Sequence, residues 1–407
     1  MKAYVIRGNL RAHKKFAGGR PAIPYIIGLS MSTSPPEKDA RQDSRPVREI
    51  RINPIVPSES VLVATARSMR PRKAEEPVPR DTRSHVETCP FCRGNEDQTP
   101  PEILRVPEDG EWQIRIVENL YPVLGDDAPA PGSGLSFGLQ QAIDGYGRHE
   151  VIIDHASHGI AVHEMTREHL GRLFATFQQR MRLLYDSDPR LRYVLVFKNF
   201  GPAAGASMAH THSQMIATPV VPQNVHDEVV NSQQYYQKHH RCIFCTLIDE
   251  ALTFETTIYD RESGEVVRQI NVGQYVIERS ERFIAIKPFA SRYEWEVHLL
   301  PLRHESSFLA ADAADLDDLG RLLRRTMARL DAVIGGAQYN FFLHTRPRCD
   351  DYPGSEHSYH WHLEICPRTS IPTGFELGSG LFVNTVSPEE AAERLREVVL
   401  PDETGLQ

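Results

Sequence analysis

The sequence predicts an α+β protein made of two tandem copies of one unit, each an antiparallel sheet backed by helices. Three observations support this prediction. The same motifs occur twice in the same order, although residue identity between the two copies is low. Each copy combines short runs of β-branched or apolar residues with one long helical stretch. The chain has 407 residues, which is long enough for two domains of ordinary size.

The composition is that of an ordinary soluble globular protein, with 40% hydrophobic and 25% charged residues. The formal net charge of -8 excludes a general nucleic-acid or anionic-membrane surface, because phosphate-backbone binding requires clustered Lys and Arg. A small anionic ligand held in one pocket remains compatible with this charge. No apolar run approaches the length of a transmembrane span, so we expect a cytoplasmic protein.

Residues 1–48 are expected to be a disordered or wrongly assigned N-terminal extension. The first thirty residues carry six basic side chains and no acidic one, a pattern that also occurs in targeting peptides. We favour Met31 as the true start over a targeting peptide. The stretch that follows it, "STSPPEKDARQDSRPV", is then a polar tail that contains prolines.

The first copy, residues 49–222, begins its chemistry at Cys89-Pro-Phe-Cys92. A structural zinc site takes four nitrogen or sulfur ligands, and a C-x-x-C turn supplies two thiolates. The natural partners are His158, after the predicted strand "RHEVIID", and His210. Spacing alone leaves three other histidines as alternatives: His149, His155 and His163. A thioredoxin-like redox pair is disfavoured, because the motif occurs twice with histidines following in the same order.

The stretch "SMAHTHSQM" follows a predicted buried strand, "LRYVLVFKNF", and a turn-rich "GPAAG". If "MAHTHSQMIAT" is itself a strand, then His210, His212 and Gln214 lie on one face, because side chains alternate along a strand. The three polar groups would then converge on a single site. The alternative is that they are surface residues of a half-exposed strand.

Residues 223–240 are polar and partly helical and form the expected linker to the second copy, residues 241–400. The second copy repeats the pattern with Cys242, Cys245, His304 and His360, which predicts a second zinc site. Glu364 stands where Gln214 stands in the first copy. Since a carboxylate facing a phosphate repels it, we predict that the second H-x-H is a degenerate, non-catalytic copy.

Several motifs together resemble the galactose-1-phosphate uridylyltransferase family, a branch of the histidine-triad superfamily. They are "CPFCRGNEDQTPPEI", "VENLYPVL", "HEVIIDHASHG", "NFGPAAGASMAHTHSQ" and "GFELGSG", and the resemblance runs from about Arg51 to Arg396. It implies two tandem histidine-triad-like domains, zinc as the metal, a homodimer, and transfer of a nucleoside monophosphate between a nucleotide sugar and a sugar phosphate or phosphate.

The resemblance also implies roles for single residues. His212 is the nucleophile that forms a covalent nucleotidyl-histidine, Gln214 holds a phosphoryl oxygen, and His210 is a zinc ligand with Cys89, Cys92 and His158. The implied substrate contacts are Asn53, Arg67, Asn119, Asn199, Gly205, Ser207 and Glu376.

The chemistry of these residue types agrees with that reading. A neutral imidazole is a good nucleophile at phosphorus, and a glutamine that only donates a hydrogen bond suffices for a sugar phosphate that leaves as an anion. Gln214 therefore favours transfer over hydrolysis.

Thr211 and Ser213 replace the proline and glycine usual in the uridylyltransferases, so we expect strand stiffness and access to the phosphate to differ. The C-terminal "GFELGSGLFVN" lacks the sugar-contacting glutamine of the hexose uridylyltransferases and is similar to the ADP-glucose phosphorylase branch, which leaves the substrate open. The transferred group is therefore UMP or AMP. The alternative of a different class is a non-catalytic, zinc-stabilised nucleotide-binding module.

Overall fold

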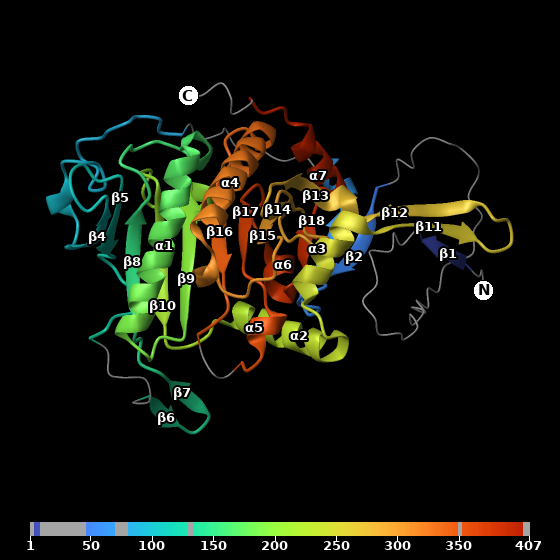
Figure 1. The fold of residues 1–407 in the computed structure, drawn as a ribbon, viewed down its shortest axis with the longest axis horizontal. Coiled ribbons are helices and arrows are strands. Elements are labelled where there is room, and N and C mark those ends of the chain that lie inside the picture. The colour runs from blue at the N-terminus through green and yellow to red at the C-terminus, as the bar shows by residue number, and fades with distance from the viewer. Residues whose placement is uncertain (1–3, 9–45, 70–79, 128–133, 349–351, 402–407) are drawn as a thin grey trace.

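A ten-stranded antiparallel sheet runs through the middle of the protein (Figure 1). The computed structural model describes residues 4–8, 46–69, 80–127, 134–348 and 352–401. The strand order is β13-β14-β15-β17-β16-β9-β10-β8-β5-β4. The first copy contributes β4 (Glu102–Val106), β5 (Ile114–Glu118), β8 (Arg148–Ile153), β9 (Tyr193–Phe200) and β10 (His212–Thr218). The second contributes β13 (Val276–Arg279), β14 (Phe283–Ile286), β15 (Val297–Pro301), β16 (Tyr339–His344) and β17 (His362–Pro367).

The two copies use their strands in the same spatial order and meet where β9 pairs with β16. In this pairing Asn199 lies directly opposite Asn340. The predicted α+β fold of antiparallel sheets backed by helices is thus confirmed. The edge-to-edge union of the two sheets into one was not predicted, because hydrophobic patterning identifies strands and leaves open which strands pair.

Two long helices cover one face of this sheet, α1 (Arg167–Ser187) and α4 (Ala313–Ile334) (Figure 1). Thr166 and Asp312 cap their N-termini by accepting hydrogen bonds from backbone amides. The helices touch at Gly171 and Gly320, where a Cβ on Gly320 would lie 2.9 Å from the Gly171 nitrogen. Glycine is needed there because the two backbones approach closely. The apolar faces of both helices and the sheet form one shared core.

The remaining elements surround this layer. Residues 223–240, the expected linker, contain α2 (Gln223–His239), and the other helices are α3 (Ile243–Thr253), α5 (Ser355–Ser358), α6 (Gly374–Ser379) and α7 (Pro388–Glu397). The 3-10 turns are η1 (Thr65–Met69), η2 (Glu96–Gln98), η3 (Val162–Glu164), η4 (Pro202–Ala204), η5 (Val272–Tyr275) and η6 (Phe308–Ala310). Small sheets join β18 (Phe382–Asn384), β3 (Ser60–Ala64) and β2 (Arg48–Ile52), and β6 (Leu135–Phe137) with β7 (Gln140–Ala142).

Most of the N-terminal extension lies outside the described residues. Within it, β1 (Tyr4–Gly8) pairs with β11 (Glu255–Asp260), which in turn pairs with β12 (Val266–Asn271). Among the helices that the structure describes, none combines the length and apolar character needed to cross a lipid bilayer.

Candidate active site and metal centres

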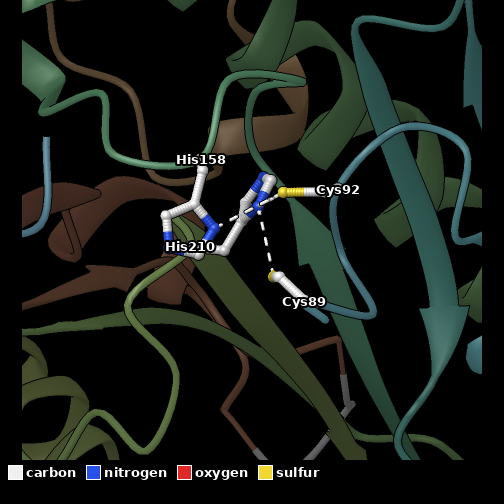
Figure 2. Close-up of side chains that lie close together, drawn as sticks. All are labelled: Cys89, Cys92, His158 and His210. Carbon is white, nitrogen blue, oxygen red and sulfur yellow. Dashed lines mark hydrogen bonds between the residues drawn. The ribbon is translucent and has the colours of Figure 1, made fainter. Parts of the chain in front are cut away.

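Four side chains of the first copy converge on one buried point: Cys89, Cys92, His158 and His210 (Figure 2). One ligand atom from each lies within 4.8 Å of the others. The Cys92 Sγ lies 3.4 Å from His158 Nδ1 and 3.5 Å from His210 Nδ1, and the Cys89 Sγ lies 3.7 Å from His210 Nδ1. Two thiols and two imidazoles arranged in this way form a donor set that can hold a metal ion.

The outer ring nitrogens of the two histidines indicate how this set is oriented. His210 Nε2 lies 2.8 Å from the His155 carbonyl oxygen, and His158 Nε2 lies 3.3 Å from the Asp81 carboxylate. Both Nε2 atoms can therefore donate a proton to an oxygen, which leaves both Nδ1 atoms as acceptors facing the cysteines. Metal-binding histidines are commonly oriented by such a hydrogen bond from the second ring nitrogen.

The second copy contains a matching cluster of Cys242, Cys245, His304 and His360. The Cys245 Sγ lies 3.4 Å from His304 Nδ1 and 3.6 Å from His360 Nδ1. Here both outer nitrogens face backbone carbonyls: His304 Nε2 lies 3.0 Å from that of Glu356, and His360 Nε2 lies 2.9 Å from that of Pro301. The two clusters thus share composition and ring orientation.

The three alternative histidines of the first copy lie outside its cluster. His149 contacts Gln214, and the Nδ1 of His155 accepts a hydrogen bond from the Ser157 amide. His163 faces Asp331, with 3.8 Å between its Nε2 and the carboxylate. The structure therefore gives none of these three side chains a place beside Cys89 and Cys92.

His212 and His210 direct different ring nitrogens at a backbone carbonyl: His212 its Nδ1, and His210 its Nε2. His212 Nδ1 lies 2.8 Å from the His210 carbonyl oxygen, so Nδ1 carries the proton and the lone pair of Nε2 is left for a substrate. Burial lowers the pKa of His212, and the nearby charge of Lys198 lowers it further. The imidazole is consequently neutral near pH 7, as a nucleophile must be.

Strand β10 begins at His212, four residues after Met208, the first residue of the predicted strand "MAHTHSQMIAT". Only His212 and Gln214 therefore lie on the strand, while His210 precedes it and belongs to the metal cluster. The edge of the Phe91 ring contacts both imidazoles. The His210 side chain, just before the strand, reaches the C-x-x-C loop, where its Nδ1 lies 3.5 Å from the Cys92 Sγ.

A buried ion pair behind His212 was not predicted from the sequence. The fully buried Lys198 ammonium donates to the Asp154 carboxylate at 2.7 Å, to the Thr211 hydroxyl at 2.8 Å and to the His212 carbonyl oxygen at 2.9 Å. The Ser213 hydroxyl donates to the same carboxylate at 3.0 Å. Thr211 and Ser213, which replace the proline and glycine usual in the family, therefore both hydrogen-bond to this pair: the Thr211 hydroxyl accepts from Lys198, and the Ser213 hydroxyl donates to Asp154.

Gln214 is oriented by His149. The Val123 amide donates to His149 Nδ1 at 3.3 Å, and His149 Nε2 lies 2.8 Å from the Gln214 Oε1. The amide nitrogen of Gln214 then faces away from His149 and is free to donate to a ligand. Asn119 lies beside the same ring, with its Nδ2 3.1 Å from His149 Nε2.

The loop after β9 is closed largely by its own amides. The amides of Ala204 and Ala206 donate to the Gly201 carbonyl, and that of Gly205 donates to Pro202. Gly205 has a φ of 83°, a left-handed conformation that favours glycine. These three amides therefore close the turn. The Ser207 hydroxyl is exposed, and the Asn199 Oδ1 accepts a hydrogen bond from Asn340.

Three predicted substrate residues lie away from His212. The Asn53 amide donates a hydrogen bond to the Glu59 carboxylate. Both residues line a cavity of about 720 Å³ whose wall includes Glu364 of the second copy. Arg67 lies near Glu376, and their charges interact. The Glu376 carboxylate also accepts hydrogen bonds from Thr373 at the start of α6. The structure does not bring Asn53, Arg67 or Glu376 into contact with His212.

The second H-x-H has acidic neighbours. His362 Nε2, which corresponds to the nucleophilic nitrogen, lies 3.5 Å from Glu364 Oε1 and 3.9 Å from Glu228 Oε1. Glu364 is also paired with Arg292 at 3.0 Å. With His344, these histidine and glutamate side chains form another group of metal-ligand composition. The nitrogen of His362 is thus directed at carboxylates, which repel a phosphate.

Comparisons with known proteins agree with this site. A family model described as the N-terminal domain of galactose-1-phosphate uridyl transferase matches residues 38–222. The chain is 32% identical to an ADP-glucose phosphorylase of Arabidopsis thaliana, over 86% of this chain and 93% of that protein. It is 27% identical to a galactose-1-phosphate uridylyltransferase of Thermotoga maritima, over 86% of this chain and 98% of that protein. A crystal structure of an Arabidopsis thaliana ADP-glucose phosphorylase with bound ADP-glucose superimposes with a TM-score of 0.70 at 29% identity, covering 87% of this chain and all of that one.

The doubled antiparallel sheet, with an H-x-H at the start of a central strand and cysteines beside it, defines a transferase of the histidine-triad superfamily. Nucleotidyl transfer is the reaction of this class. The chain belongs to the galactose-1-phosphate uridylyltransferase family.

Proposed function

We propose that this protein moves a nucleoside monophosphate from a nucleotide sugar to a phosphate-bearing acceptor, through a covalent intermediate on His212. The opposite orientation of two neighbouring histidines supports this proposal most strongly. His210 directs Nδ1 into the metal cluster, whereas His212 donates its Nδ1 proton to the His210 carbonyl and keeps Nε2 free. The cysteine–histidine cluster thus holds His210, and the His210 carbonyl in turn orients the His212 ring.

The reaction proceeds in two displacements at the α-phosphorus. His212 Nε2 forms a bond to phosphorus while the bond to the bridging oxygen breaks, and the sugar phosphate leaves with that electron pair. An oxygen of the acceptor then attacks the same phosphorus, and Nε2 leaves. The Nδ1 proton stays in place, and its hydrogen bond to the His210 carbonyl stabilises the cationic imidazole of the intermediate.

The polar groups around His212 have distinct parts in this scheme. The Gln214 amide, oriented by His149, donates to a phosphoryl oxygen, and Asn199 and Ser207 hold the neighbouring phosphate. None of these groups needs to supply a proton, because a sugar phosphate leaves as an anion. Asn119, beside His149, contacts the nucleotide.

Zinc is the metal we propose for both clusters. Two cysteines and two histidines are the usual ligands of a closed structural zinc site, and the outer ring nitrogens are already held by oxygens. Cys89, Cys92, His158 and His210 would hold one ion, and Cys242, Cys245, His304 and His360 the other. Such an ion supplies rigidity, so the protein's contribution here is positioning.

We propose ADP-glucose as the donor and phosphate as the acceptor. The full-length similarity to an ADP-glucose phosphorylase supports this choice, as does the glycine-rich "GFELGSG" segment. Uridylyl transfer from UDP-glucose to a hexose phosphate is the second candidate, which the match to the family model and to the Thermotoga maritima relative favours.

A homodimer would account for the distant substrate residues. Asn53, Arg67 and Glu376 lie on the side of the second copy, and we propose that they reach the nucleotide bound at the partner's His212. We further propose a cytoplasmic location, with no nucleic-acid or membrane partner, consistent with the net charge of -8. Residues 49–222 and 241–400 are the proposed extents of the two histidine-triad-like domains.

A product assay tests this function and identifies the donor and acceptor. We expect ADP-glucose and phosphate together to give ADP and glucose 1-phosphate, and neither compound alone to react at a comparable rate. UDP-glucose with galactose 1-phosphate should react at least about tenfold more slowly in kcat/KM. The reverse preference would favour the second candidate. No release of glucose 1-phosphate from either pair would contradict transfer and favour a non-catalytic module.

A further inference from the structure

The second copy contacts the phosphate loop of the first copy directly, through Asn340 on β16. Its side-chain nitrogen donates to the Asn199 Oδ1 and to the Ala204 carbonyl oxygen, both at 2.8 Å. Asn199 and Asn340 are cross-strand neighbours in the β9–β16 pairing that joins the two copies. Both hydrogens of one amide group are therefore used to tie a strand residue to the loop that follows that strand.

Gln338, two residues earlier on the same side of the chain, holds the other end of the loop. Its Oε1 accepts the Ala203 amide proton at 2.7 Å. Its side chain also covers Gly201, where an added Cβ would lie 2.5 Å from the Gln338 Cγ. Gly201 has a φ of 86°, which favours glycine, and a side chain at this position would displace Gln338 from its contact.

These contacts determine which way the Asn199 amide faces. Because Asn340 occupies Oδ1, the Asn199 Nδ2 is directed elsewhere, and we see no protein acceptor for it among the described residues. Phe197 pairs with Gln214 across β9 and β10, so Asn199 is level with His212 on the adjacent strand. In the strand register, the Asn199 side chain with its Nδ2 donor is thus level with His212.

We propose that Asn340, assisted by Gln338, is a positioning residue for nucleotidyl transfer, and that holding this loop is a function of the otherwise degenerate second copy. This inference rests on the function proposed above. Asn340 does not touch the reacting atoms. It acts through Asn199 and the Ala204 carbonyl, which set the donor that meets the phosphate chain in the transition state.

A double-mutant cycle tests the proposal. We expect Asn340→Ala to slow formation of the nucleotidyl-enzyme in a single turnover by about 10- to 100-fold, with the KM of the nucleotide sugar changed by less than about threefold. Asn199→Ala should slow it at least as much. In the Asn199→Ala background, Asn340→Ala should add less than about a twofold loss, because its target is already absent. A wild-type rate in Asn340→Ala, or losses that multiply in the double variant, would overturn the proposal.

Two further variants separate positioning from stability. Asn340→Asp keeps the side-chain shape but removes the donors and places a charge against the Asn199 oxygen, so a loss at least as large as that of Asn340→Ala is expected. A wild-type rate in Asn340→Asp would also contradict the positioning role of Asn340. Asn231→Ala removes an equivalent amide that bonds only within α2 and should keep the wild-type rate. If the unaltered protein forms no adduct with any nucleotide sugar, the proposed function itself fails and this inference with it.

Discussion

Replacing His212 by alanine is expected to lower the rate of nucleotidyl transfer by at least about 10⁴-fold. The covalent route is lost with Nε2. Among the residues that the structure describes, the corresponding nitrogen of the second copy, on His362, faces two carboxylates. The metal content and thermal midpoint should stay close to wild type, because the His212 side chain is outside the cluster. Steady-state assays with the preferred donor and acceptor, together with metal analysis, measure both quantities.

His362→Asn is the matched control for this variant. It removes the equivalent histidine of the second copy and should keep most of the transfer rate, because the second H-x-H is proposed to be non-catalytic. Residual transfer above about 1% of the wild-type rate in His212→Ala would show that His212 is not the nucleophile. An equal loss of transfer in His362→Asn would contradict the non-catalytic role of the second H-x-H.

Replacing Cys92 by serine is expected to remove one metal ion per chain and to slow transfer by about 100-fold or more. Cys92 contacts both His158 and His210, and the carbonyl of His210 holds the Nδ1 proton of His212. Loss of this ligand therefore releases the nucleophile as well as the metal. Metal analysis of the purified protein and the steady-state rate are measured together.

Two other cysteine variants make this result interpretable. Cys366→Ser alters a buried thiol that lies outside both clusters, so it should keep both metal ions and most activity. Cys245→Ser should lose the second ion but retain more activity than Cys92→Ser, since the second cluster does not touch His212. Full metal content in Cys92→Ser, or full activity without the first ion, would contradict the positioning role of the first cluster.

The two clusters of cysteines and histidines were predictable because much of their geometry is local. A C-x-x-C turn presents two thiols side by side whatever the fold around it, and the doubled order of motifs selects the histidines. The structure gathers both sets of four. The strand and helix types of each copy were equally accessible from hydrophobic periodicity, as α1 and α4 illustrate.

Contacts between distant parts of the chain could not be predicted in this way. Lys198 interrupts an apolar strand, which is a signal of a buried charge, but its partner Asp154 is 44 residues away. The pairing of Asn199 with Asn340 spans 141 residues and depends on the register between two sheets. His149 was considered only as a metal ligand, because its bond to Gln214 depends on the facing of neighbouring strands.

The intact mass of the purified protein, after brief exposure to ADP-glucose or to UDP-glucose without acceptor, tests the covalent mechanism most directly. We predict an added mass equal to one AMP from ADP-glucose, absent in His212→Ala, with little or no UMP-sized addition from UDP-glucose. A UMP-sized addition alone would keep the mechanism and reverse the donor. No addition from either compound in folded, metal-loaded protein, or an addition that persists in His212→Ala, would contradict nucleotidyl transfer through His212.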